Sequence, residues 1–304
     1  MMGAGKAKPP RPSSPTAFRS YSIDNPNDLT TGPDGAVWVT GHGPNYVARL
    51  SRSGTINVFT TPTADGKRAG IAVGPDGNLW FTELVGGHIG RVSPSGSFTM
   101  FALPRPGGVS NIAWGGDGSM WFGEPESSRL GRVTIAGSIS ELALSASEDP
   151  TFVAARADGS IWFTEPQTNR VVEYRQDHSF RHFDLPNASS APWGIAACHD
   201  GNVWFTERDG NRIGQISADG KLLELPVPTA SSVPFAITCA PSGDAWFTEF
   251  DEKANRIGRM RPDGMVDEFP IPTPASNPSG IAIQDSNTVW FVENSGHHLT
   301  RLQL

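Results

Sequence analysis

Seven tryptophans recur at a nearly constant interval along the chain, and this repeat constrains the possible folds more than any other feature of the sequence. They are Trp38, Trp80, Trp121, Trp162, Trp204, Trp246 and Trp290, with intervals of 42, 41, 41, 42, 42 and 44 residues. A fixed period of this length indicates that one supersecondary unit is repeated and that each copy packs on its neighbours.

Each repeat carries the signals of four short strands. In the second repeat these are GIAVG (70–74), NLWFTE (78–83), HIGRVS (88–93) and SFTMFALP (97–104). A dipeptide such as Asp76-Gly77 precedes the tryptophan, and it favours a tight hairpin because glycine tolerates positive φ. Four antiparallel strands per repeat predict an all-β, seven-bladed β-propeller. A solenoid of helical repeats is the competing architecture, and the absence of a 3.6-residue apolar period opposes it.

The N-terminal segment is predicted to close the ring. The last repeat ends after three strands, at LTRLQL (299–304), whereas Tyr21-x-Ile23 matches the fourth-strand pattern Phe101-x-Leu103. We therefore expect residues 18–23 to form the fourth strand of the seventh blade, which removes an exposed sheet edge. The predicted organisation is a disordered tail over residues 1–15 and a single propeller domain over residues 16–304.

Composition excludes several classes of protein. The 31 acidic residues outnumber the 24 basic ones, which gives a formal charge of −7 and opposes binding to a nucleic-acid backbone. No apolar run reaches the 18 or so residues of a membrane span. The opening residues lack the apolar segment of a secretory signal. We expect a cytoplasmic monomer with a small-molecule ligand and no nucleic-acid or membrane partner.

The chain has two cysteines, Cys198 and Cys239. Two residues cannot build a disulfide framework, and the sequence has no Cys-x-x-Cys pair to hold zinc. Both are predicted to be small buried side chains.

One register of the repeat is a candidate binding surface. The residues eleven positions before each tryptophan begin the first strand of each blade, so they share one end of the ring. They vary while the scaffold around them repeats: Asn27, Ala69, Ser110, Thr151, Trp193, Phe235 and Ser279. Such variation is typical of a binding surface on a repeat scaffold, and loops that merely tolerate change are the alternative.

A second register, three residues after each tryptophan, is acidic in six repeats. It holds Gly41, Glu83, Glu124, Glu165, Glu207, Glu249 and Glu293. A ring of carboxylates could bind a cation, but repetition in six blades favours a structural role, such as pairing with the recurrent Arg of NRIG. The neighbouring His42 is the best candidate for a general base, and a solvated loop histidine is the alternative reading.

The repeat core resembles the streptogramin B lyase (virginiamycin B lyase) family. The resemblance rests on GPDGNLWFTELVGGHIGRVSPSG (74–96) and GNVWFTERDGNRIGQISADG (201–220), and it covers residues 18–304. It implies a seven-bladed propeller that opens a cyclic depsipeptide antibiotic by eliminating across an ester C–O bond, without water and with the help of magnesium.

The chain departs from this family at the expected catalytic positions. Ser279 and Phe235 stand where the resemblance implies two histidines, one of them the catalytic base. Asn277 and Asn294, the latter beside Glu293, stand where it implies two magnesium-binding glutamates. Magnesium remains the cofactor that the resemblance implies, although its ligands are not retained, and no other metal site is predicted.

Three functional hypotheses follow. The first is an enzyme on the same scaffold, a lyase, isomerase or cyclase acting on a natural product, with His42 and Glu293 as proton-transfer groups. Its predicted ligand-binding residues are Asn27, Ser110, Thr151, Trp193, Phe235, Asn277, Ser279 and Asn294. The second is a propeller that binds a ligand or protein without catalysis, and the third is a lactonase-like hydrolase. The two large aromatic residues in one register favour a small, largely apolar ligand over a flat protein partner.

Overall fold

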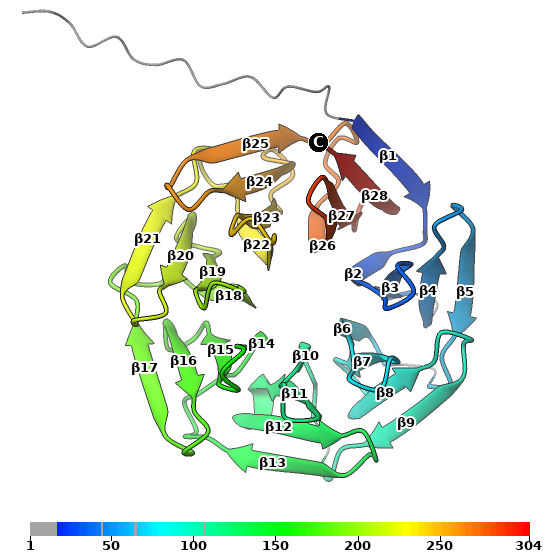
Figure 1. Cartoon of the computed structure of the whole chain (residues 1–304), viewed down its shortest axis with the longest axis horizontal. Coiled ribbons are helices and arrows are strands. Elements are labelled where there is room, and N and C mark those ends of the chain that lie inside the picture. Colours follow the sequence, from blue (N-terminus) through cyan, green and yellow to red (C-terminus); the bar gives the residue numbers. More distant parts are fainter. Residues whose placement is uncertain (1–16, 44, 64–65, 106) are drawn as a thin grey trace, which may run out of the picture.

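A computed structural model describes residues 17–43, 45–63, 66–105 and 107–304 of the chain. Its strands form seven four-stranded antiparallel sheets arranged around a central axis (Figure 1). The innermost strands are β2, β6, β10, β14, β18, β22 and β26, and the chain passes outward through each sheet before entering the next. The predicted all-β, seven-bladed propeller is confirmed.

The first four blades follow the order of the sequence. Blade 1 comprises β2 (Pro26–Thr31), β3 (Val37–Gly41), β4 (Tyr46–Leu50) and β5 (Ile56–Thr60). Blade 2 comprises β6 (Arg68–Val73), β7 (Leu79–Glu83), β8 (His88–Val92) and β9 (Phe98–Ala102). Blade 3 comprises β10 (Ile112–Trp114), β11 (Ser119–Glu124), β12 (Arg129–Thr134) and β13 (Ile139–Ala143), with a short 3-10 helix, η1 (Pro125–Ser127), after β11. Blade 4 comprises β14 (Val153–Ala155), β15 (Ile161–Glu165), β16 (Arg170–Tyr174) and β17 (Phe180–Asp184).

The last three blades lead back to the N-terminus. Blade 5 comprises β18 (Pro192–Ala197), β19 (Val203–Glu207), β20 (Arg212–Ile216) and β21 (Leu222–Pro226). Blade 6 comprises β22 (Pro234–Cys239), β23 (Ala245–Glu249), β24 (Arg256–Met260) and β25 (Val266–Pro270). Blade 7 comprises β26 (Pro278–Asp285), β27 (Thr288–Glu293), β28 (His298–Gln303) and β1 (Ala17–Ser22).

The N-terminal strand closes the ring as predicted. β1 pairs with β28 over six residue pairs, from Ala17 opposite Gln303 to Ser22 opposite His298. The paired segment begins and ends one residue earlier than the predicted range of 18–23. The predicted tail over residues 1–15 lies outside the described residues.

The repeated residues explain why the blades pack. Each second strand is buried along its whole length, so both of its faces meet other parts of the core. The tryptophan stacks on an aromatic ring of the fourth strand, as Trp80 does on Phe101 with ring centroids 5.4 Å apart. The following Phe81 lies opposite Gly90, where an added Cβ would lie 2.0 Å from the phenyl ring. In blade 2, the third strand β8 therefore needs glycine at this position to make room for the Phe81 ring.

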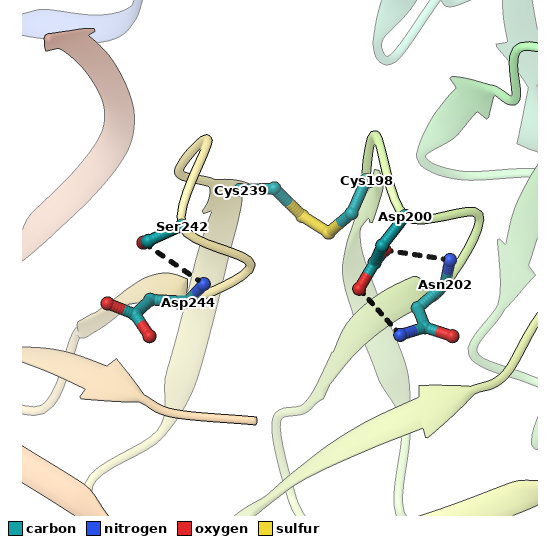
Figure 2. The surroundings of a disulfide bond; sticks show 6 residues. All are labelled: Cys198, Asp200, Asn202, Cys239, Ser242 and Asp244. Carbon is teal, nitrogen blue, oxygen red and sulfur yellow. Dashed lines mark hydrogen bonds between the residues drawn. A yellow bond between two sulfur atoms is a disulfide. The ribbon is translucent and has the colours of Figure 1, made fainter. Parts of the chain in front are cut away.

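The two cysteines form a disulfide between blades 5 and 6, which corrects the prediction of two separate small side chains (Figure 2). Cys198 follows the end of β18 and Cys239 ends β22, and their Cα atoms lie 5.6 Å apart. Cys239 occupies the register of Ala197, so Cys198 lies one residue further along its own repeat. The adjacent ends of two inner strands bring the cysteines together, although they are 41 residues apart in sequence. Within the described residues, no helix is long and apolar enough to span a membrane.

Candidate functional site

A register shift at the start of the inner strands turns two consecutive residues toward the axis. In blade 1 the pairing of β2 with β3 shifts between Pro26 and Asp28, and equivalent shifts occur in β6, β18, β22 and β26. A regular strand would send neighbouring side chains to opposite faces, whereas a bulge re-aims one of them. Asn27 and Asp28 therefore both line the axial opening.

The opening holds a cavity of about 520 Å³ that three registers of the repeat enclose. The mouth register, eleven residues before each tryptophan, contributes Asn27, Ala69, Ser110, Thr151, Trp193, Phe235 and Ser279. The floor register, one residue deeper along each strand, contributes Asp28, Gly70, Asn111, Phe152, Ala236 and Gly280. The rim register, which follows the repeated glutamate, contributes His42, Leu84, Pro125, Pro166 and Arg208.

One side of the cavity is aromatic. Phe152, Trp193 and Phe235 of blades 4, 5 and 6 form a continuous row, with successive ring centroids 5.8 and 5.7 Å apart, and Phe250 stacks behind Phe235 at 5.0 Å. The Arg208 guanidinium lies 4.6 Å from the centroid of the Trp193 ring, within the range of a cation–π contact. Trp193 and Phe235 are thus neighbours in one wall, and they leave the cavity open rather than sealing it.

The other side of the cavity is polar and includes the half-buried carboxyl group of Asp28. One Asp28 carboxylate oxygen, Oδ2, accepts a hydrogen bond of 3.2 Å from the backbone N–H of Ile71 in blade 2. In blade 3, Asn111 Oδ1 accepts the equivalent bond, also 3.2 Å, from the Val153 N–H of blade 4. Burial raises the pKa of Asp28 to about 7, because loss of water disfavours the charged form more than the backbone N–H groups favour it.

A hydroxyl group connects every blade to the next at the mouth of the cavity. In five blades the threonine of the second strand donates to the next blade's mouth carbonyl, as Thr206 does to Phe235 O at 2.7 Å. Blades 3 and 7 have Gly123 and Val292 at this position. There the mouth serine takes over, so that Ser110 donates to Thr151 O and Ser279 donates to Asn27 O at 2.8 Å.

The position of Gly123 explains the exchange in blade 3. A Cβ at Gly123 would lie 2.2 Å from the carbonyl oxygen of Pro150, so no threonine fits there. Ser110 supplies the hydroxyl from the neighbouring strand instead. Ser110 and Ser279 line the cavity, but each hydroxyl proton is already used between blades.

The repeated glutamates lie inside the blades and not in the cavity. All six side chains are fully buried or nearly so, and each stands opposite the first residue of the third strand, which is Arg170 for Glu165. The Arg170 Nε lies 3.4 Å from the Glu165 carboxylate. Burial raises the pKa of Glu124, Glu165 and Glu207 to about 7 and that of Glu249 to about 8. This arrangement agrees with the structural reading of these residues.

The residues that stand at the family's magnesium positions do not form a metal site. The Asn277 side chain donates from Nδ2 to Phe250 O at 3.0 Å and accepts at Oδ1 from the Ser295 hydroxyl at 2.6 Å. Asn294 donates its backbone N–H to Asn277 O, and Glu293 accepts from the Thr300 hydroxyl inside blade 7. In the described part of the chain, no three His, Cys, Asp or Glu side chains gather as metal ligands. No step involving magnesium is derived for this chain.

The structure brings most of the predicted site residues to the cavity. Those that line it are Asn27, His42, Ser110, Thr151, Trp193, Phe235 and Ser279. Glu293, Asn277 and Asn294 lie outside the lining, so the two predicted proton-transfer groups, His42 and Glu293, do not share the site. The sequence reading missed Asp28, Asn111, Phe152, Asp149 and Arg208. The first three vary at one register, which is the signal that identified the mouth residues.

The chain is thus a seven-bladed β-propeller with a cavity of about 520 Å³ at its axial mouth. The model of the Virginiamycin B lyase family matches residues 17–302, and the chain belongs to that family. A search of curated proteins gives no match.

Solved structures agree with this assignment. A streptogramin B lyase structure is 34% identical, with a TM-score of 0.90 over 95% of this chain and 98% of that one. Selenomethionine-substituted virginiamycin B lyase from Staphylococcus aureus is 32% identical, with a TM-score of 0.90 over 95% of this chain and all of that one. A catalytically inactive variant of the Staphylococcus aureus enzyme with quinupristin is 32% identical, with a TM-score of 0.89 over the same shares of the two chains. A hydrazine synthase at 13% identity shares the fold alone.

Proposed function

We propose that this chain binds a small, largely apolar ligand of the natural-product kind in its axial cavity and acts on it as a lyase or isomerase. The observation that carries the proposal is the aromatic row Phe152–Trp193–Phe235 beside an open cavity of about 520 Å³. Cavities of this size that are lined by aromatic side chains and a few polar groups commonly hold small organic molecules.

The proposed chemistry differs from magnesium-dependent opening of streptogramin B. Phe235 carries no proton acceptor, and Ser279 commits its hydroxyl proton to Asn27 O. Proton transfer in the cavity would fall to its titratable side chains, which include Asp28, His42 and Asp149. Burial likewise raises the pKa of Asp149, to about 6.

A propeller that binds its ligand without catalysis is the second candidate. It is favoured by the state of Ser279, because the residue at the position of the family's base serves the connection between blades 7 and 1. The two candidates share the same cavity and the same ligand class, and they differ only in turnover.

Binding is tested with 2-(1-naphthyl)ethanol, a neutral bicyclic probe, by isothermal titration calorimetry. We expect Trp193→Ala combined with Phe235→Ala to weaken binding at least about tenfold, since two aromatic contacts are lost, while the melting temperature stays within about 2 °C. Trp114→Ala is the matched control, because Trp114 is half exposed at the far end of an inner strand and outside the cavity. Unchanged binding by the double variant, or a large loss of its stability, would contradict the proposal.

Turnover is tested with quinupristin, with and without magnesium, by chromatographic separation of the cyclic and linear forms. We expect no linear product at a rate above that of buffer. Magnesium-dependent opening would contradict this part of the proposal and would make His42 and Asp28 the first residues to substitute.

A further inference from the structure

Asp28 has a charge that its structural role does not require. Its carboxylate accepts one hydrogen bond from the N–H of the next blade, and the neutral amide of Asn111 accepts the same bond at the same distance. The blades with Gly70, Gly194 and Gly280 at this register have no side-chain acceptor at all. A carboxyl group at this position is therefore not explained by the packing of blade 1 against blade 2.

Among the side chains that the structure describes, no cation pairs with this carboxylate. Asp28 takes part in no ion pair with a described residue, and the groups that polarise it are the backbone N–H groups of Leu29 and Ile71. Of the other charged or titratable groups in the cavity, Asp149 accepts from the Gln167 N–H and lies near Arg170. Arg208 covers Trp193 and pairs with Asp209 at 3.1 Å, and His42 lies at the rim.

The cavity thus has two unlike sides: Asp28 at the floor of blade 1 and the aromatic row in blades 4 to 6. Asp28 is half-buried, and partial loss of water around a carboxylate without a counter-charge costs free energy that a bound cation offsets. An aromatic row in turn favours an apolar group, and it also tolerates a nearby ammonium.

We propose that Asp28 is the recognition group for a protonated amine, and that the ligand of the cavity is an aryl or otherwise apolar amine whose apolar part lies against Trp193 and Phe235. This inference rests on the proposed function, because it specifies the chemical class of the ligand of the same cavity. The amine nitrogen donates to the Asp28 carboxylate and replaces the water that it loses on burial.

The test compares three probes that share one ring system: 2-(1-naphthyl)ethylamine, 2-(1-naphthyl)ethanol and 1-naphthylacetate. Affinities are measured at pH 8.0, where the amine is protonated and the pH lies above the raised pKa of Asp28. We expect the amine to bind at least about tenfold more tightly than the alcohol, and the carboxylate to bind most weakly, as for a close charge pair in a desolvated site.

Asp28→Asn should reduce the affinity for the amine to that for the alcohol and leave the alcohol unchanged. The variant keeps the acceptor for Ile71, as Asn111 does in blade 3. Asp28→Gly, which places the residue of three other blades here, is the second variant if the first does not fold. Asp24→Asn is the matched control, because it removes the same charge from an exposed residue in the connection between β1 and β2.

The possible failures are distinguishable. Equal affinities of the amine and the alcohol for the unsubstituted protein overturn this inference and leave the proposed function intact. Loss of the preference in Asp149→Asn but not in Asp28→Asn also overturns it, because the cation then lies at Asp149. If none of the three probes binds, the proposed function fails and this inference fails with it.

Discussion

Two junctions of the ring hold together by different means. Blades 5 and 6 are joined by the disulfide Cys198–Cys239 (Figure 2). At the opposite strand ends they are joined by the hydrogen bond from Thr206 to Phe235 O. Blades 7 and 1 are joined by the backbone between β1 and β2 and have no disulfide. They depend on the pairing of β1 with β28, on packing, and on the hydrogen bond from Ser279 to Asn27 O.

The two sides of the cavity lie in parts of the ring that are connected in these different ways. The inner strand β22, which carries Phe235, is tied to blade 5 at both ends, by the disulfide at one end and by the hydrogen bond from Thr206 of β19 at the other. Trp193 lies on β18, the strand that leads to Cys198. The strand β2, which carries Asp28, follows directly after the closing strand β1 and is held by hydrogen bonds and packing alone. The aromatic side is therefore the more constrained one, and the charged side depends on ring closure.

Removal of residues 1–22 tests the closure and should have the largest effect. The truncation deletes β1, so β28 becomes an exposed edge and Trp290 loses its contact with Tyr21, whose ring centroid lies 5.8 Å away. We expect the melting temperature to fall by more than about 10 °C. Differential scanning calorimetry measures it, and a truncation of residues 1–14, which leaves β1 intact, is the control. Equal stability of the two truncations would contradict the closure.

Replacement of both cysteines by alanine tests the covalent junction and should have an intermediate effect. A disulfide that closes a loop of this length restricts the unfolded chain and contributes about 3–4 kcal/mol. We expect urea denaturation to show a loss of that order in the free energy of unfolding. A reducing agent should produce the same change in the unsubstituted protein and none in the variant. An unchanged denaturation midpoint in both experiments would show that the disulfide does not contribute to the free energy of unfolding.

A pH titration compares blades 5 and 6 with blade 1 and should have the smallest effect. Blades 5 and 6 bury Glu207 and Glu249, whose pKa values burial raises to about 7 and about 8, whereas blade 1 has Gly41 at this position. Because the folded-state pKa lies above the unfolded one, their contribution to stability is complete below about pH 4.5 and is lost as the pH rises through 7 to 8. We expect the melting temperature to fall by about 3 °C between pH 6 and pH 9.

The neutral amides mimic the protonated acids, so Glu207→Gln combined with Glu249→Gln should flatten this slope. Glu252→Gln, an exposed substitution in the loop after β23, is the control and should keep it. A slope that is unchanged in the double variant would assign the pH dependence to other groups.

The repeat made the fold predictable, because one period fixes the number of blades, their strands and the closing segment. The mouth register was predictable for the same reason. The floor register was not, since Asp28 reaches the axis only through the bulge at the start of β2, and period-two alternation would have turned it away. The disulfide was not predictable from the number of cysteines alone. Cys198 and Cys239 lie 41 residues apart, one residue less than the interval between the tryptophans of their blades.

The predicted role of Glu293 and the predicted location also depend on features that the sequence pattern does not show. Glu293 stood beside a position of interest in sequence, yet its side chain enters the sheet and bonds Thr300. The cytoplasmic location stays a prediction, and the Cys198–Cys239 disulfide opposes it, because disulfides persist mainly in oxidising compartments.

The hydroxyl groups that connect the blades also determine which cavity positions can be redesigned. Where a threonine of the second strand makes the connection, the mouth side chain is left out of it, as at Ala69, Thr151, Trp193 and Phe235. A library that varies these four positions would change ligand selectivity while every inter-blade hydroxyl bond remains in place. Varying Ser110 or Ser279 would cut such a bond with each substitution, so selection for binding there would be mixed with selection for folding.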